Sequence, residues 1–73
     1  MYDLIVLKTS VSEVEDFIVD YFRNPNEIFD AILDISEPRR GDVLIEADYD
    51  TIEDLGYALE SEGYEVKSNT LPF

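Results

Sequence analysis

The stretch from residue 37 to residue 47 reads EPRRGDVLIEA, and it decides the fold of this 73-residue chain. Its first five residues have the Pro, Gly and charged composition of a turn of hairpin length. The residues at 42–47 are rich in branched apolar side chains, which are typical of a strand. A strand that follows a hairpin turn needs a partner strand before the turn, so the assignment of the preceding segment depends on this stretch.

The preceding segment, residues 27–36, reads EIFDAILDIS and fits two patterns. As a helix, it places a short apolar stripe on Ile28, Phe29, Ile32 and Leu33. As a strand, it places Asp30 and Asp34 on the outward face. The inward face then carries Phe29, Ala31, Leu33 and Ile35. Because the hairpin turn follows directly, the sequence predicts a hairpin that joins 28–35 to 42–47.

Toward the amino terminus, residues 4–7 (LIVL) predict a strand that is buried on at least one face. A helix follows this strand, because Ser10 with Glu13, or Ser12 with Glu15, forms a capping box. Its apolar residues recur with helical spacing at Val14, Phe17, Ile18, Tyr21 and Phe22. The helix is expected to end at residues 24–26 (NPN), since the residue before a proline avoids the helical region.

Toward the carboxyl terminus, Asp50 is expected to cap a second helix, which ends at Gly63. Residues 64–68 (YEVKS) alternate as a strand does. The order β-α-β-β-α-β predicts an α+β fold of the ferredoxin-like, split βαβ type, with a four-stranded antiparallel sheet and two helices on one face. No linker divides the chain, so residues 1–73 are expected to form a single acidic domain.

The composition is strongly acidic, because 18 Asp and Glu against 5 Lys and Arg give a formal charge of −13, although 45% of the residues are apolar. With no Cys and no His, the chain has no thiolate zinc site, no Cys nucleophile and no His general base. No apolar run approaches the ~20 residues of a membrane span, and no signal peptide is evident, which favours a cytoplasmic location. Like-charge repulsion disfavours direct binding to nucleic acid or to an anionic membrane.

The excess of negative charge is the main functional clue, because self-repulsion destabilises so small a domain. Carboxylates three or four positions apart on a helix lie about 5–6 Å apart, and rows of them can imitate the phosphates of DNA. The sequence therefore predicts a surface that occupies the DNA-binding site of a basic protein; a solvated acidic surface without a partner is the alternative. The expected contact residues are Glu13, Asp16, Asp20, Glu53, Asp54 and Glu60, supported by Asp30, Asp34 and Glu46.

A second hypothesis concerns the sheet face that the helices leave open. In the predicted register, Ile32 and Leu44 lie on this face, and an exposed apolar strip with a charged rim is typical of an interface. The sequence predicts a homodimer, formed through this face or through an edge strand, or a regulatory module that binds a small ligand or a sister subunit. The alternative is that Leu71 and Phe73 of the carboxyl-terminal tail cover it.

The remaining motifs predict no chemistry. Residues 48–53 (DYDTIE) hint at a calcium loop, but Ile52 and Glu53 stand where an oxygen ligand and a glycine are needed. Residues 40–42 (RGD) match the integrin-binding tripeptide, although turn chemistry explains them. No glycine-rich phosphate loop, nucleophile elbow or pocketed carboxylate pair is evident, so no enzyme activity, catalytic residue, metal or cofactor is expected.

Two resemblances follow from these residues. Residues 43–68, which contain DTIEDLGYALESEGYEV, resemble the strand–helix–strand half of ferredoxin-like regulatory domains, such as ACT-type domains and the carboxy-terminal domain of YebC-type regulators. In size and charge, the whole chain is similar to the small acidic DNA-mimic proteins with which bacteriophages disable host factors. This resemblance implies an inhibitor in the bacterial host cytoplasm or nucleoid. Its first-choice partner is a nucleoid protein of the HU type, and the others are RNA polymerase, a restriction enzyme or a CRISPR effector.

Overall fold

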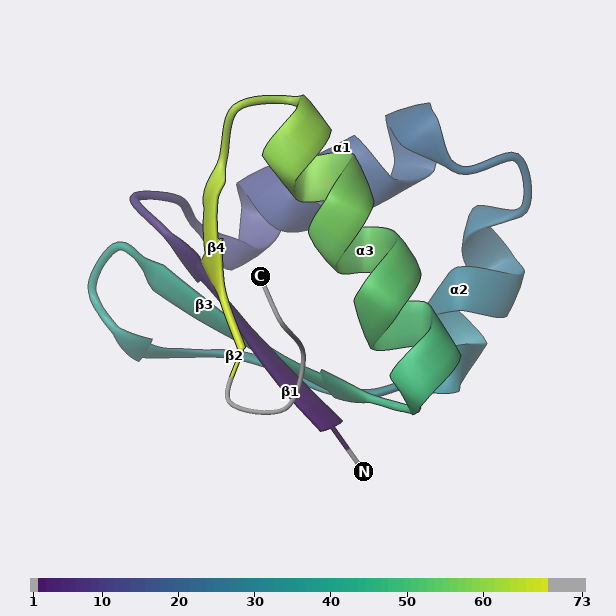
Figure 1. Ribbon diagram of the computed structural model, residues 1–73, viewed down its shortest axis with the longest axis horizontal. Helices are drawn as coiled ribbons and strands as arrows, with labels where there is room; N and C mark the ends of the chain where they lie inside the picture. Colours follow the sequence, from purple (N-terminus) through teal and green to yellow (C-terminus); the bar gives the residue numbers. More distant parts are fainter. Residues whose placement is uncertain (1, 69–73) are drawn as a thin grey trace.

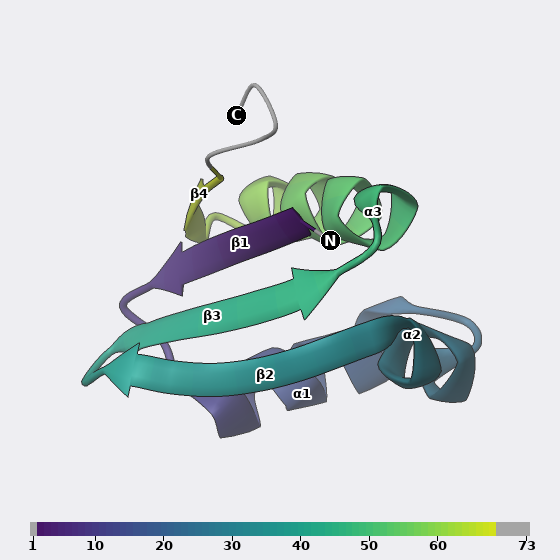
Figure 2. The same cartoon turned by 90° about the horizontal axis from the view of Figure 1, so that it is seen from below.

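The computed structural model describes residues 2–68 of the chain (Figure 1). Its elements follow in the order β1 (Tyr2–Leu7), α1 (Val11–Tyr21), α2 (Pro25–Ala31), β2 (Ile32–Arg39), β3 (Asp42–Ala47), α3 (Tyr49–Ser61) and β4 (Glu65–Lys67). The strands form one sheet in the order β2-β3-β1-β4, and every neighbouring pair is antiparallel (Figure 2). The predicted α+β fold of the ferredoxin-like, split βαβ type is confirmed in its strand order.

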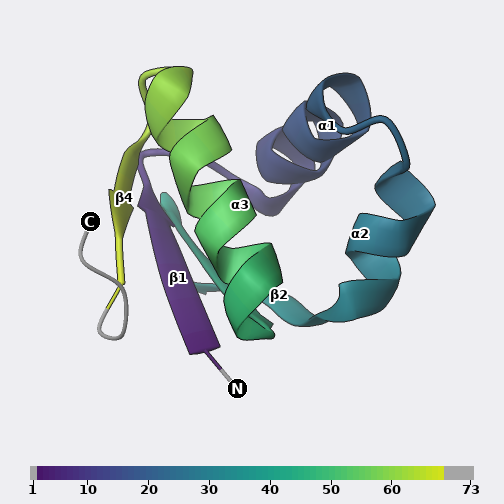
Figure 3. The ribbon, with the colours of Figure 1, turned by 45° about the vertical axis from the view of Figure 1, so that its right-hand side comes forward.

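The helices cover one face of the sheet and enclose the core (Figure 3). The two central strands, β1 and β3, contribute side chains that are fully buried: Leu4, Val6, Val43 and Ile45. Helices α1 and α3 meet them with the fully buried side chains Val14, Ile18, Ile52, Leu55 and Leu59. Val14 and Ile18 belong to the apolar stripe that the sequence predicts for the first helix, and the three residues of α3 recur with the same helical spacing. The other face of the two central strands is left free of helices.

The segment before the hairpin is not the single strand that the sequence predicts at 28–35. It divides at Ile32, where the short helix α2 ends and β2 begins. Pro25 stands at the first position of α2, where its fixed φ and its missing N–H favour the start of a helix. Phe29 consequently packs on the core from a helix. Residues 2–68 thus contain three helices instead of two, and none of these is both long and apolar enough to cross a membrane.

Strand β2 also adopts a register that differs from the predicted one. The register with β3 shifts between Ile32 and Asp34, so the residue between them is bulged. That residue, Leu33, is 64% exposed, although it is predicted to face inward. Ile32 packs against the core instead, together with Ile35, which is predicted to face inward. The prediction that Ile32 lies on the open face is therefore wrong, whereas Asp34 does lie there, opposite Glu46.

Side-chain caps fix where the two long helices begin. Ser10, one of the two predicted candidates, accepts a hydrogen bond at 3.3 Å from the backbone N–H of Glu13. Helix α3 is capped by Asp48, which accepts from the N–H of Thr51 at 2.9 Å, and not by Asp50. The hydrogen bonds from Thr51 hold the pKa of Asp48 below its ordinary value. Asp50 lies in the first turn of α3 and is exposed.

Two glycines reverse the chain at positions where a side chain would be strained. Gly41, with φ of 91°, makes the hairpin turn between β2 and β3, and Gly63, with φ of 95°, follows the end of α3. Both roles are as predicted. The tripeptide at residues 40–42 is accordingly part of a tight turn, whose glycine is required by the backbone.

Candidate functional site

The three helices carry charge of one sign only. Together α1, α2 and α3 contain ten acidic residues and no Lys or Arg: Glu13, Glu15, Asp16, Asp20, Glu27, Asp30, Asp50, Glu53, Asp54 and Glu60. Glu53 is half-buried and the other nine are exposed. Three of the ten are absent from the predicted contact residues: Glu15, Glu27 and Asp50. In the sequence, only their negative charge could have indicated that they belong to this surface. We call these three helices together the helix layer.

On α1, the predicted residues Glu13, Asp16 and Asp20 are all exposed. Their spacing of three and four positions separates them by about 4.5 Å and about 6 Å along the helix axis. A single DNA strand carries one phosphate about every 3.4 Å of axis, so the row is somewhat sparser than a phosphate row but of the same order. Glu13 is also held in place, because its carboxylate accepts a hydrogen bond from the hydroxyl of Thr9.

On α3, the predicted residues Glu53, Asp54 and Glu60 surround Tyr57, which is 55% exposed. Positions 53, 57 and 60 follow one stripe of the helix, and Asp54 lies beside it. The hydroxyl of Tyr49 donates to the Glu53 carboxylate at 3.2 Å. This hydrogen bond and the charge of Glu53 raise the pKa of Tyr49.

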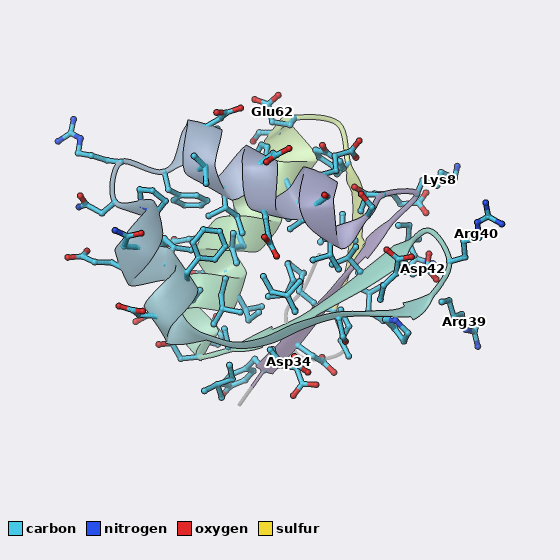
Figure 4. The ribbon with its side chains drawn as sticks, turned by 180° about the vertical axis from the view of Figure 1, so that it is seen from behind. Lys8, Asp34, Arg39, Arg40, Asp42 and Glu62 are labelled. Atoms are coloured by element: carbon cyan, nitrogen blue, oxygen red, sulfur yellow. The ribbon has the colours of Figure 1, made fainter. Side chains whose placement is uncertain are left out.

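Three of the five basic residues lie together, away from the helix layer. Lys8, Arg39 and Arg40 gather with Asp42 at the hairpin end of the molecule (Figure 4). Arg23 lies in the link between α1 and α2. Within residues 2–68, the structure records no ion pair between a basic side chain and a carboxylate. The carboxylates of the helix layer are therefore not neutralised by neighbours in that part of the chain.

Two of the nine predicted contact residues lie on the opposite face of the molecule. Asp34 of β2 and Asp3 of β1 are the two cross-strand neighbours of Glu46 on β3. Directly opposite residues have Cβ atoms about 4.5–5.5 Å apart, so these three carboxylates form a row across three strands, which we call the acid row. Asp3 is absent from the prediction, although the alternation of β1 could have indicated it. Asp30, by contrast, belongs to the helix layer through α2.

The open sheet face also carries an apolar strip, which we define as Ile5, Leu7 and Leu44. Leu44 lies on this face as predicted and is the cross-strand neighbour of Ile5. The strip borders a pocket of about 340 Å³ lined by Ile5, Leu7, Pro38, Arg39, Asp42 and Lys67. The predicted cover for this face, Leu71 and Phe73, lies outside the described residues.

A second pocket lies between the carboxyl-terminal half of α1 and Glu62, the residue that follows α3. It measures about 240 Å³ and is lined by Phe17, Asp20, Tyr21 and Glu62. The rings of Phe17 and Tyr21 stack with centroids 5.2 Å apart and an interplanar angle of 21°. Tyr64 meets Phe17 edge-on at 5.8 Å. Tyr21 is predicted to belong to the buried stripe, yet it is 51% exposed. We call this hollow the α1–α3 pocket.

The surroundings of the α1–α3 pocket are electronegative. Burial raises the pKa of Tyr64, and the charge and hydrogen bond of Glu13, followed by the charge of Glu62, raise it further. The carboxyl end of a helix carries a partial negative charge, which a basic residue in the last turn usually offsets. Neither α1 nor α3 has such a residue. The carboxylates of Asp20 and Glu62 and the end of α3 thus add their negative potential beside this pocket.

The described residues offer no metal site. Residues 2–68 contain no group of three or more acidic side chains placed to hold a metal ion. The carboxylates of the calcium-loop-like segment serve local structure, because Asp48 caps α3 and Glu53 accepts the hydrogen bond from Tyr49.

Comparison of the chain with models of protein families, with curated proteins and with solved structures finds no match.

Proposed function

We propose that this protein binds a basic nucleic-acid-binding protein through its helix layer and displaces DNA by occupying the same site. The observation that carries the proposal is the presence of ten carboxylates and no basic residue on the three helices. A cationic groove attracts such a surface over about one Debye length, ~10 Å at about 0.1 M salt. Competitive occupancy is sufficient for inhibition, and no catalytic step is needed.

The helix layer is a better candidate than the whole predicted set of contact residues. Asp34 and Glu46 lie on the far side of the sheet from the helices, so one basic surface cannot contact them together with Asp16 and Asp20. The first-choice partner is a histone-like nucleoid protein, because such proteins bind the DNA backbone by its charge and shape rather than by base sequence.

A gel-shift competition with a purified histone-like nucleoid protein of the HU type tests the proposal. At low salt, excess of the acidic protein is expected to release the DNA. Direct binding between the two proteins, followed by fluorescence anisotropy, is expected to weaken as salt is raised, because salt screens attraction between exposed charges.

Polyglutamate at the same concentration of charge is the matched control, because it supplies carboxylates without fixed positions. It is expected to release less DNA than the folded protein does. Retention of the DNA in excess of the acidic protein, or equal release by the polymer, would contradict the proposal.

A second candidate function is a regulatory or assembly module that acts through the open sheet face. The observation that favours it is the apolar strip of Ile5, Leu7 and Leu44, with the pocket beside it. An apolar strip with a charged rim suits a second copy of this chain, a sister subunit or a small ligand. In that case the acidic residues of the helix layer contribute nothing to binding.

Sedimentation velocity on two leucine variants tests the open face. Leu44→Glu places a charge inside the apolar strip, and it is expected to convert a dimer to a monomer. Leu33→Glu is the matched control, because this exposed leucine lies on the bulge, outside the strip. A wild-type protein that is monomeric throughout the micromolar range, or equal dissociation by both variants, would exclude a homodimer through this face.

A further inference from the structure

The α1–α3 pocket differs in chemistry from the rest of the acidic surface. Elsewhere on the helix layer, the carboxylates project from open helix faces. Here Asp20 of the helix layer and Glu62, just after α3, line a hollow whose remaining lining is the stacked pair of aromatic rings. Figure 4 places Glu62 on a different side of the molecule from Lys8, Arg39 and Arg40, so those basic side chains do not fill the pocket.

We infer that the α1–α3 pocket receives one arginine side chain of the basic partner, an inference that rests on the proposed function. A guanidinium group is flat, stacks on aromatic rings and donates hydrogen bonds in a fork that matches carboxylates. The half-exposed ring of Tyr21 offers the surface for stacking. Asp20 and Glu62, both exposed, offer carboxylates from the two helix ends that form the walls.

The electrostatics of this corner favour a cation over a neutral ligand. Asp20 and Glu62 supply two carboxylates, and α3 ends beside the pocket without a basic residue in its last turn, so its partial negative charge adds to theirs. Arginine is preferred to lysine, because an ammonium group is more strongly hydrated and has no flat face to stack on Tyr21.

A titration followed by NMR tests the inference. The probe is the capped peptide acetyl-Gly-Arg-Gly-amide, added to the isotopically labelled full chain. Saturable shifts are expected at Phe17, Asp20, Tyr21 and Glu62, and not evenly over the helix layer. The citrulline peptide has the same shape without the charge, and it is expected to bind at least about tenfold more weakly. The lysine peptide is expected to bind more weakly than the arginine peptide by at least about threefold.

Two variants locate the site. Tyr21→Leu keeps an apolar side chain beside Phe17 but removes the ring, and Asp20→Asn removes one carboxylate. Each is expected to weaken binding of the arginine peptide by about fivefold. Glu15→Gln changes the charge by the same amount as Asp20→Asn on the same helix, outside the pocket, and should change binding by less than about twofold. Circular dichroism establishes that the variants are folded.

Several results would overturn the inference. Equal loss from Asp20→Asn and Glu15→Gln would mean that only net charge matters. Equal binding of the citrulline or lysine peptide would exclude an arginine pocket. The proposed function can fail separately. If the arginine peptide binds in the pocket but the protein releases no DNA from its partner, the arginine site is supported and the proposed function is contradicted. If wild type and Tyr21→Leu release DNA equally, the pocket does not receive an arginine of the partner, whereas the proposed function is supported.

Discussion

Replacement of both Asp16 and Asp20 by lysine is expected to reduce DNA displacement at least about tenfold at about 0.1 M salt, or about 1.4 kcal/mol of binding free energy. The two residues lie four positions apart on the exposed side of α1, so both changes affect the same stripe. A cationic groove that attracts the wild-type stripe repels the variant stripe. The measurement is the concentration of acidic protein that releases half of the DNA in the gel-shift competition.

The matched control carries the same change of charge outside the helix layer. Each exchange of an acid for lysine adds two charges, so the double variant moves from −13 to −9. Glu37→Lys with Glu65→Lys reaches the same value at two exposed residues on β2 and β4. This control is expected to lose less than about threefold. Equal loss by both double variants would mean that net charge alone acts, and no loss by either would remove the helix layer as the contact surface.

Much of the fold could be predicted because its signals are local. The inward positions of α3, such as Ile52, Leu55 and Leu59, follow from helical periodicity alone. The alternation of β3 likewise fixes which of its side chains face the helices. Gly41 and Gly63 mark chain reversals because their backbone conformation is one that other residues adopt only with strain.

The segment from Pro25 to Arg39 could not be predicted correctly, because its outcome depends on contacts distant in sequence. Its apolar residues satisfy both a helical stripe and a strand face, and the choice depends on where β3 can pair. The bulge at Leu33 then exchanges the faces of Ile32 and Leu33. The residues after the bulge, Asp34 and Ile35, keep the faces that the alternation predicts, so the error is confined to the two residues where the helix gives way to the strand.

The candidate site, like the fold, could be predicted only where its signals are local in the sequence. Exposure of the acidic residues could be predicted, because ionised carboxylates are seldom buried without a partner. Their division between two faces could not, since it requires the arrangement of the strands. The α1–α3 pocket was missed for the same reason: Glu62 meets Phe17 and Tyr21 only after the chain has crossed the sheet.

Glu46→Lys is expected to stabilise the fold by about 1–2 kcal/mol, although it alters no core residue. Glu46 lies between Asp3 and Asp34 in the acid row, so it takes part in two cross-strand pairs of like charge. Lysine converts both into pairs of opposite charge, and each such pair contributes roughly 0.2–1 kcal/mol. In a domain of this size, about 1 kcal/mol raises the Tm by roughly 4–8 °C, which calorimetry or thermal circular dichroism measures.

Glu15→Lys is the matched control for stability. It changes the net charge by the same amount, but the residues three and four positions away on α1 are uncharged: Val11, Ser12, Ile18 and Val19. It therefore reports only the relief of general self-repulsion, and its Tm is expected to rise by less than half as much. An equal rise in both variants would show that the acid row adds no local repulsion. A fall in the Tm of Glu46→Lys would contradict the register between β3 and its neighbours.

The same variant separates the two faces of the molecule in function. Glu46 lies across the sheet from the helix layer, so Glu46→Lys is expected to change DNA displacement by less than about twofold while the protein becomes more stable. A partner that binds the open sheet face would instead meet a reversed charge at the centre of the acid row. If the stabilised variant loses displacement by about tenfold or more, the assignment of the contact to the helix layer is wrong, and the sheet face binds the partner.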